Sequence, residues 1–192
     1  EDTVSYLRGR GKNVIYDAEH FFDGFKDSRE YALETLRAAE RAGAEWIVLC
    51  DTRGGSTPFE VYEATLAAAD EVKKPLGMHA HNDMGLGVAN SVAAVEAGAR
   101  MVQGTVNGIG ERCGNADLIQ VIGVLELKMG VKTGFELSRL TELSDYVYEL
   151  TTLDENPRQP FVGRYVFSHK GGVHGHAVLK ATEAYEFVDP SL

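Results

Sequence analysis

The sequence predicts an α/β fold, the C-terminal half of a (β/α)8 barrel, with about four βα units followed by a helical linker region. Two observations predict it. Short apolar runs alternate with amphipathic stretches, which indicates a parallel sheet with helical crossovers. Residues 38–49 also resemble residues 93–104, each with a helical stretch that ends in Ala-Gly-Ala before an apolar run. Such an echo favours a closed barrel over an open doubly wound sheet.

The expected strands are the four apolar runs, at residues 13–19, 45–52, 74–81 and 100–108. The expected helices carry Ala, Leu and Val at helical spacing and end near Gly or Pro, at residues 28–43, 58–72 and 84–98. We expect Gly43 and Gly98 to adopt the left-handed turn that closes a helix before a buried strand.

The character of the chain changes after about residue 130. Residues 135–151 are typical of a helix, 154–165 of a proline-containing connector, and 168–180 are rich in Gly and His. We therefore expect a partial barrel over residues 1–130, and a helix, a linker and the start of a following subdomain over 131–192.

Composition narrows the class of protein. The 192 residues are 44% hydrophobic and 25% charged, as in a soluble globular domain, and the apolar runs are far shorter than the roughly 18 residues of a membrane span. The net charge of −10 argues against nucleic-acid and anionic-membrane partners. Two cysteines make no disulfide framework, which predicts a cytoplasmic protein. The chain does not begin with Met, so we expect a fragment.

A His-Ala-His-Asn-Asp motif follows the third apolar run. Side chains two residues apart on a strand point to the same face, so His79 and His81 can aim at one metal ion. Active sites of barrels lie at this end of the strands. The alternative is that both histidines only cap the strand or bond its neighbours.

The next strand leads into a loop rich in Gly and Asn, residues 104–115. Its glycines suggest a backbone brought close to a ligand, and Asn115 can present a carbonyl oxygen to Mg²⁺, Mn²⁺ or Zn²⁺. The alternative is a tight strand-to-helix turn. We expect Cys113 to be a small buried residue rather than a ligand.

Other chemistry-bearing residues follow the first two strands. Asp17 and Glu19 share a strand face, where a carboxylate can act as a general base or remain a solvated acid. Thr52 can donate its hydroxyl to a substrate carboxylate, and Gly54 and Gly55 leave N–H groups for an anion.

Three histidines, His169, His174 and His176, lie within eight residues of one another near the C-terminus. Imidazole titrates near neutral pH, so a catalytic proton carrier and a solvated loop are both compatible with this segment.

The His-Ala-His-Asn-Asp motif and the stretch GTVNGIGERCGNADL resemble the family of isopropylmalate, homocitrate and citramalate synthases. Three further stretches, YDAEHFFDGF, WIVLCDTRGG and QPFVGRYVFSHKGGVHGHAVLK, look most like the citramalate synthase branch. The resemblance implies a metal-dependent TIM barrel that condenses acetyl-CoA, as co-substrate, with a 2-oxo acid, here pyruvate.

The resemblance also assigns roles to residues. His79, His81 and Asn115 match metal-site positions. Glu19 matches the acidic residue assigned to acid/base work, and Thr52 matches the group that holds the carboxylate of the oxo acid.

His174 matches a catalytic histidine that is donated from the region after the barrel, usually across a homodimer, and Tyr185 matches its tyrosine partner. The family's Asp-Arg-Glu-type opening strand, which supplies a metal Asp and a substrate Arg, is absent from this sequence. The resemblance therefore implies that the chain does not catalyse alone.

Other functions stay open at this point. Within the family, 2-oxoisovalerate would replace pyruvate and give isopropylmalate. Barrels of the HMG-CoA lyase and biotin-dependent carboxyltransferase types also use paired histidines, although the latter expects a strand-end lysine that this sequence lacks. A non-catalytic metal-binding domain is the alternative of another class.

Overall fold

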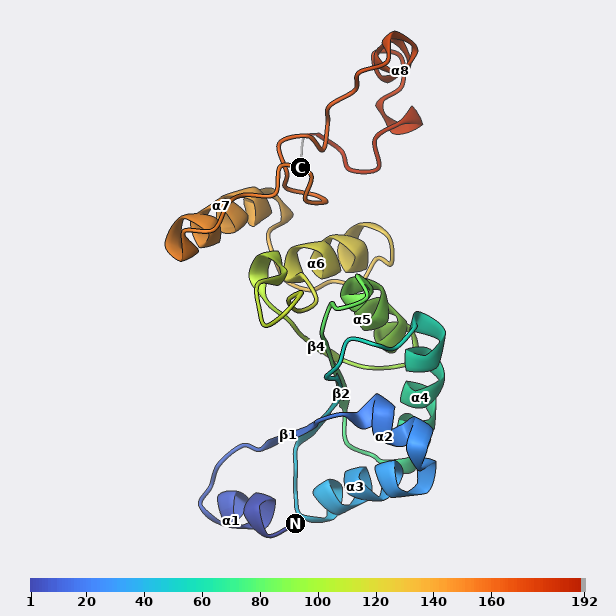
Figure 1. Ribbon diagram of the computed structural model, residues 1–192, viewed down its shortest axis with the longest axis vertical. Helices are drawn as coiled ribbons and strands as arrows, with labels where there is room; N and C mark the ends of the chain where they lie inside the picture. The colour runs from blue at the N-terminus through green and yellow to red at the C-terminus, as the bar shows by residue number, and fades with distance from the viewer. Residues whose placement is uncertain (191–192) are drawn as a thin grey trace. The chain divides into compact units, whose positions relative to one another are not determined.

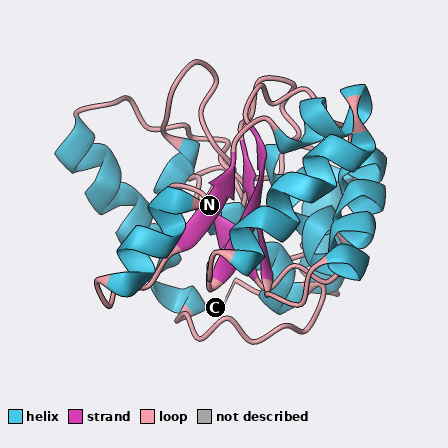
Figure 2. Cartoon of the chain, turned by 90° about the horizontal axis from the view of Figure 1, so that it is seen from below, coloured by secondary structure: helices cyan, strands magenta, loops and turns pink. Residues whose placement is uncertain are grey.

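The computed structural model describes residues 1–190, which divide into two compact units, residues 1–118 and 119–190. The first unit is built on one parallel sheet of four strands in the order β1-β2-β3-β4. Figure 1 labels β1, β2 and β4 of this sheet, and Figure 2 draws its strands in magenta. The strands are β1 (Ile15–Ala18), β2 (Trp46–Asp51), β3 (Leu76–Ala80) and β4 (Met101–Gln103). Each lies within one of the four predicted runs.

Helices connect consecutive strands of the first unit. They are α2 (Phe21–Asp27) and α3 (Arg29–Arg41) after β1, α4 (Pro58–Glu71) after β2, and α5 (Gly87–Glu96) after β3. A sheet that grows strand by strand in one direction has the winding of a barrel, whereas a doubly wound sheet reverses its order. The predicted fold, part of a (β/α)8 barrel, is confirmed.

The helices bury one face against the sheet. In α4 the buried residues are spaced three and four apart, at Val61, Ala64, Thr65 and Ala68, which places them on one stripe of the helix. The helix begins with a capping box, in which the hydroxyl of Thr57 accepts from the N–H of Glu60 and the Glu60 carboxylate accepts from the N–H of Thr57.

The inner core lies between these helices and alternate sheet residues. Ile47, Leu49 and Met78 have no exposed surface. Because strand side chains alternate between faces, the intervening residues of each strand project from the opposite face, which is the inner face of a barrel. The candidate site is built from that face.

The predicted similarity of residues 38–49 and 93–104 is confirmed by the turns that close the two helices. Gly43 follows α3 at φ 97° and Gly98 follows α5 at φ 106°, both left-handed. Ala44 N–H donates to Ala39 O at 3.0 Å, and Ala99 N–H donates to Ala94 O at 2.9 Å, so both helices close with the same bond.

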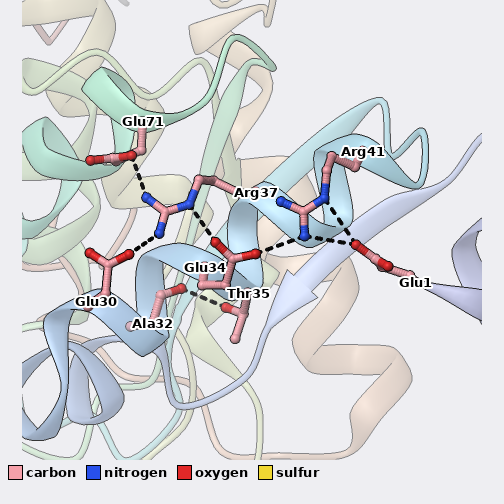
Figure 3. A network of polar contacts seen from close by, with 8 residues as sticks. All are labelled: Glu1, Glu30, Ala32, Glu34, Thr35, Arg37, Arg41 and Glu71. Atoms are coloured by element: carbon pink, nitrogen blue, oxygen red, sulfur yellow. Dashed lines mark hydrogen bonds and ion pairs between the residues drawn. The ribbon is translucent and has the colours of Figure 1, made fainter.

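Helix α1 (Asp2–Gly9) precedes β1 and was not expected from the sequence. Figure 3 shows two arginines of α3 that form ion pairs beyond their own helix: Arg37 reaches Glu71 of α4, and Arg41 reaches Glu1. Both arginines also bind Glu34, and these two hydrogen bonds hold the pKa of Glu34 below its ordinary value. The pairs join α3 to α4 and to the start of the chain.

The second unit is helical. It contains α6 (Leu118–Leu127), η2 (Leu137–Arg139), α7 (Leu140–Thr151), α8 (Gly172–Val178) and η3 (Thr182–Ala184). The ring of Phe161 packs against Gly123, where an added Cβ would lie 2.7 Å from the ring. No helix within residues 1–190 combines the length and the apolarity needed to cross a membrane. The boundary at residue 130 between two domains stays a prediction.

Candidate metal centre and active site

The two histidines of the His-Ala-His motif lie side by side at the end of β3. Their ring centroids are 5.3 Å apart, at an interplanar angle of 46°. His79 is paired in the sheet with Cys50 on one side and Gln103 on the other. His81 forms a backbone bridge with Asn115. The structure thus brings the three predicted metal-site residues to one end of the sheet.

The ring nitrogens have different surroundings. Nδ1 of His79 lies 2.8 Å from Oε1 of Gln103. Nδ1 of His81 is buried and has no hydrogen-bond partner among the described residues, which is costly for a polar atom unless a ligand satisfies it. An imidazole pair with an unsatisfied nitrogen fits a divalent metal.

The same end of the sheet offers few charged ligands. Over residues 1–190, no three His, Cys, Asp or Glu side chains gather closely enough to hold a metal. The donor set available is two imidazoles and the Asn115 amide, whose nitrogen lies 3.4 Å from Ile109 O. Such a nitrogen–oxygen set suits a metal that keeps open positions for water or substrate.

Glu19 and Thr52 are in direct contact. The Thr52 hydroxyl donates to Oε2 of Glu19 at 2.8 Å and accepts from the backbone N–H of His20 at 2.7 Å. Since a hydroxyl has a single proton to donate, Thr52 can serve either Glu19 or an incoming carboxylate, but not both.

The Gly-rich loop folds closely on itself. A Cβ on Gly110 would lie 2.0 Å from Nδ2 of Asn115, and a Cβ on Gly114 would lie 2.0 Å from Gly108 O. Gly114 also has φ 90°. These glycines therefore make room for other atoms of the same loop.

The prediction that Cys113 is buried is wrong, because its side chain is exposed. Its neighbours Arg112 and Gly114 have φ values of 54° and 90°. With a left-handed residue on each side of it, Cys113 lies in a sharp turn of the backbone, where its side chain is exposed.

Arg112 is a residue of the site that sequence reasoning missed. Its guanidinium binds both carboxylate oxygens of Asp83, at 2.8 and 2.9 Å, and donates to Thr52 O at 2.8 Å. The hydrogen bonds from Arg112 hold the pKa of Asp83 below its ordinary value, against a smaller opposing effect of desolvation. The loops after β2, β3 and β4 are thereby joined.

The N–H groups of Gly54 and Gly55, which were predicted to be open to an anion, are already occupied, and that of Gly54 donates to Asp51 O at 3.1 Å. Gly55 N–H and Ser56 N–H each donate to the carboxylate of Asp51 at 3.2 Å. Asp51 is 2% exposed, and its carboxylate also accepts from the side chains of Ser56 and Asn90. The anion held by the N–H groups of Gly55 and Ser56 is the protein's own side chain.

The C-terminal histidines belong to the second unit. The rings of His174 and Tyr185 are stacked, with centroids 4.6 Å apart. Nε2 of His169 lies 2.9 Å from Oε1 of Glu186, and the ring of His169 meets the edge of Tyr185. His176 is exposed. The two residues matched to a catalytic pair are thus in contact with each other.

We expect Cys50 to be inert and Cys113 to be the reactive thiol. Cys50 is 2% exposed, and burial, followed by the negative charges of Asp17 and Glu19, raises its pKa to about 12. At pH 8 iodoacetamide should modify one thiol in the folded chain and two after unfolding. Rapid modification of both thiols in the folded chain would contradict the described burial.

The same shift predicts a pH dependence of stability. The unfolded chain ionises Cys50 near its ordinary value of 9.0, whereas the folded chain keeps the proton until about pH 12. The folded state therefore binds more protons in this window, and the free energy of unfolding falls as the pH rises through it.

The architecture described so far is a four-stranded section of a (β/α)8 barrel, with paired histidines at the carboxyl end of one strand. The family model described as HMGL-like matches residues 1–147, and a model described as homocitrate synthase post-HMGL domain-like matches residues 161–192. The chain belongs to the HMGL-like family.

Curated relatives match over the whole chain. The (R)-citramalate synthases of Sulfolobus acidocaldarius and Aquifex aeolicus are 55% and 50% identical over 100% of it, and the 2-isopropylmalate synthase of Methanocaldococcus jannaschii is 39% identical over 100%. The chain spans 37% of the length of each of these two citramalate synthases and 36% of that isopropylmalate synthase.

Solved structures show the same fold at low identity. The carboxyl transferase domain of Rhizobium etli pyruvate carboxylase with oxalate has a TM-score of 0.64 at 20% identity, covering 77% of this chain and 26% of its own. The HMG-CoA lyase of Brucella melitensis has a TM-score of 0.61 at 20% identity, covering 78% of this chain and 56% of its own. These likenesses bear on the fold alone.

Proposed function

We propose that the protein containing this chain condenses acetyl-CoA with pyruvate and water to give citramalate and CoA, as an acyltransferase of branched-chain amino-acid biosynthesis. The observation that carries the proposal is the 55% identity to a citramalate synthase along the whole chain, against 39–43% for isopropylmalate synthases. The paired histidines and the Glu19–Thr52 contact support it chemically.

His79, His81 and Asn115 would hold the divalent metal, Mg²⁺, Mn²⁺ or Zn²⁺. When bound, it supplies Lewis acidity toward the ketone of a 2-oxo acid. With Nδ1 of His79 engaged by Gln103, Nε2 is the ring nitrogen left for coordination. The chain would need further ligands from substrate, water or residues outside it.

Thr52 would bind the carboxylate of pyruvate. Because its only proton now goes to Glu19, an arriving carboxylate competes for the same donor. Loss of that hydrogen bond leaves Oε2 of Glu19 without its hydroxyl donor and free to accept a proton. Substrate binding at Thr52 would in this way prepare Glu19 for proton transfer.

The reaction requires one new C–C bond. A base removes a proton from the acetyl methyl, and the resulting carbon nucleophile attacks the ketone carbon, whose oxygen gains a proton. Water then cleaves the thioester and releases CoA. Glu19 and the stacked pair His174 and Tyr185 are the candidates for the proton transfers, with the pair donated across a homodimer. The cytoplasm is the proposed compartment.

Release of CoA from the intact protein tests the choice of oxo acid. We expect kcat/KM for pyruvate to exceed that for 2-oxoisovalerate by at least about 10-fold, because a pocket shaped for one methyl group excludes an isopropyl group. A preference for 2-oxoisovalerate would make the protein an isopropylmalate synthase. Metal binding without CoA release from either acid would leave a non-catalytic metal-binding domain.

A further inference from the structure

Three side chains on the inner face of the sheet form a hydrogen-bonded row. Nδ1 of His79 lies 2.8 Å from Oε1 of Gln103, and Nε2 of Gln103 donates to Oδ1 of Asp17 at 3.2 Å. Gln103 is the direct neighbour of His79 in the β3–β4 register. Asp17 comes from β1, at the other end of the strand order. The sheet is therefore curved enough for its first and last strands to meet through side chains.

The direction of each hydrogen bond follows from the terminal carboxylate. An ionised carboxylate only accepts, so the amide of Gln103 must turn its NH₂ toward Asp17. The amide oxygen then faces His79. Since that oxygen only accepts, the ring atom opposite it must carry a proton. Nδ1 of His79 therefore carries the proton of this hydrogen bond, and Nε2 is the ring nitrogen that stays available for a metal.

We propose that Asp17 and Gln103 are positioning residues that set the tautomer and the ring orientation of His79, so that Nε2 is presented to a divalent metal. This inference rests on the proposed metal site and adds to it two residues that touch neither metal nor substrate.

The two histidines are thus held in different ways. His79 is oriented by a side-chain row that crosses the inner face. The main chain of His81 is held by its backbone bridge to Asn115, and Nδ1 of its ring has no partner within residues 1–190. Changes to the row should therefore weaken the contribution of His79 without moving His81.

The first test is the affinity of the intact protein for Mn²⁺. Gln103→Met keeps the length of the side chain and removes both hydrogen bonds, and we expect about 10- to 100-fold weaker binding, the usual cost of losing an outer partner of a ligand. Asp17→Asn should weaken binding by a smaller factor, because an amide at position 17 no longer dictates which way Gln103 points.

The double variant distinguishes the positioning of His79 through Gln103 from a direct effect of the Asp17 charge on metal binding. If Asp17 acts through Gln103, Asp17→Asn should have no further effect in the Gln103→Met background. Asp23→Asn is the matched control, because it removes one carboxylate of the same unit that lies outside the row. Equal effects of Asp17→Asn in both backgrounds, or an equal effect of Asp23→Asn, would overturn the proposal.

The second test reads the tautomer directly in metal-free protein. Nitrogen-15 NMR of the histidine rings reports which ring nitrogen carries the proton, and His79 is assigned from the signals that are lost in His79→Gln. The neutral His79 ring should carry its proton on Nδ1 rather than on Nε2. Gln103→Met should change the ratio of the two tautomers. Protonation on Nε2 would overturn the inference even if metal binds. If the predicted tautomer is observed but the intact protein binds no metal, the proposed function is contradicted, whereas the roles of Asp17 and Gln103 in orienting His79 are supported.

Discussion

We expect the His79→Ala variant of the intact protein to bind Mn²⁺ more than about 100-fold more weakly and to lose nearly all condensation of acetyl-CoA with pyruvate. Loss of a direct ligand should exceed the roughly 10- to 100-fold cost of losing a supporting partner. The fold should survive, because His79 is only partly buried and lies on the inner face of the sheet. Calorimetric metal titration and CoA release measure the two effects.

His176→Ala is the matched control for this prediction. It removes one imidazole from an exposed position, so the affinity for Mn²⁺ should stay unchanged. Acetyl-CoA-dependent turnover that persists in His79→Ala, or in protein stripped of metal, would contradict the assignment of the paired histidines. Circular dichroism of both variants separates loss of the site from loss of the fold.

The second large effect is expected at Gly114. An added Cβ would lie 2.0 Å from Gly108 O, and φ is 90°, so Gly114→Ala combines a backbone clash with left-handed strain. We expect the free energy of unfolding to fall by more than about 3 kcal/mol, beyond the typical range for single substitutions. Because Asn115 follows directly, metal affinity should fall as well.

Gly98→Ala isolates the contribution of strain. Gly98 has φ 106° but no atom within 4 Å of an added Cβ, so only the left-handed penalty of about 1–2 kcal/mol applies. Chemical denaturation of both variants gives the comparison. A loss in Gly114→Ala no greater than in Gly98→Ala would show that the loop relaxes around the new methyl group.

Much of the first unit could be predicted because its signals are local. The alternation of apolar runs and helical stretches located all four strands, and the repeated Ala-Gly-Ala located two helix ends, at Gly43 and Gly98. Helices α1 and α2 were missed. Helix α1 has no buried residue, so no apolar stripe marks it, and α2 has only seven residues, too few for a clear period.

The site could be predicted only where spacing alone sets the geometry. A two-residue period placed His79 and His81 on one face, and their rings lie 5.3 Å apart. The row from Asp17 to Gln103 joins residues 86 positions apart, which depends on sheet register and curvature. Arg112 was missed for the same reason, since its partners follow two other strands. The roles of His174 and Tyr185 came from resemblance alone and stay predictions.

The contacts of Arg112 affect the entropic cost of binding a ligand at the loops after β2, β3 and β4. One guanidinium holds Asp83 and the carbonyl of Thr52, and Asn82 N–H donates to Gly114 O at 2.9 Å, so three segments share a common anchor. The conformational entropy of these segments is lost when the chain folds rather than when a small molecule arrives. The affinity for a small molecule that binds at these loops is therefore set by the contacts it makes, with little entropic penalty for ordering the loops.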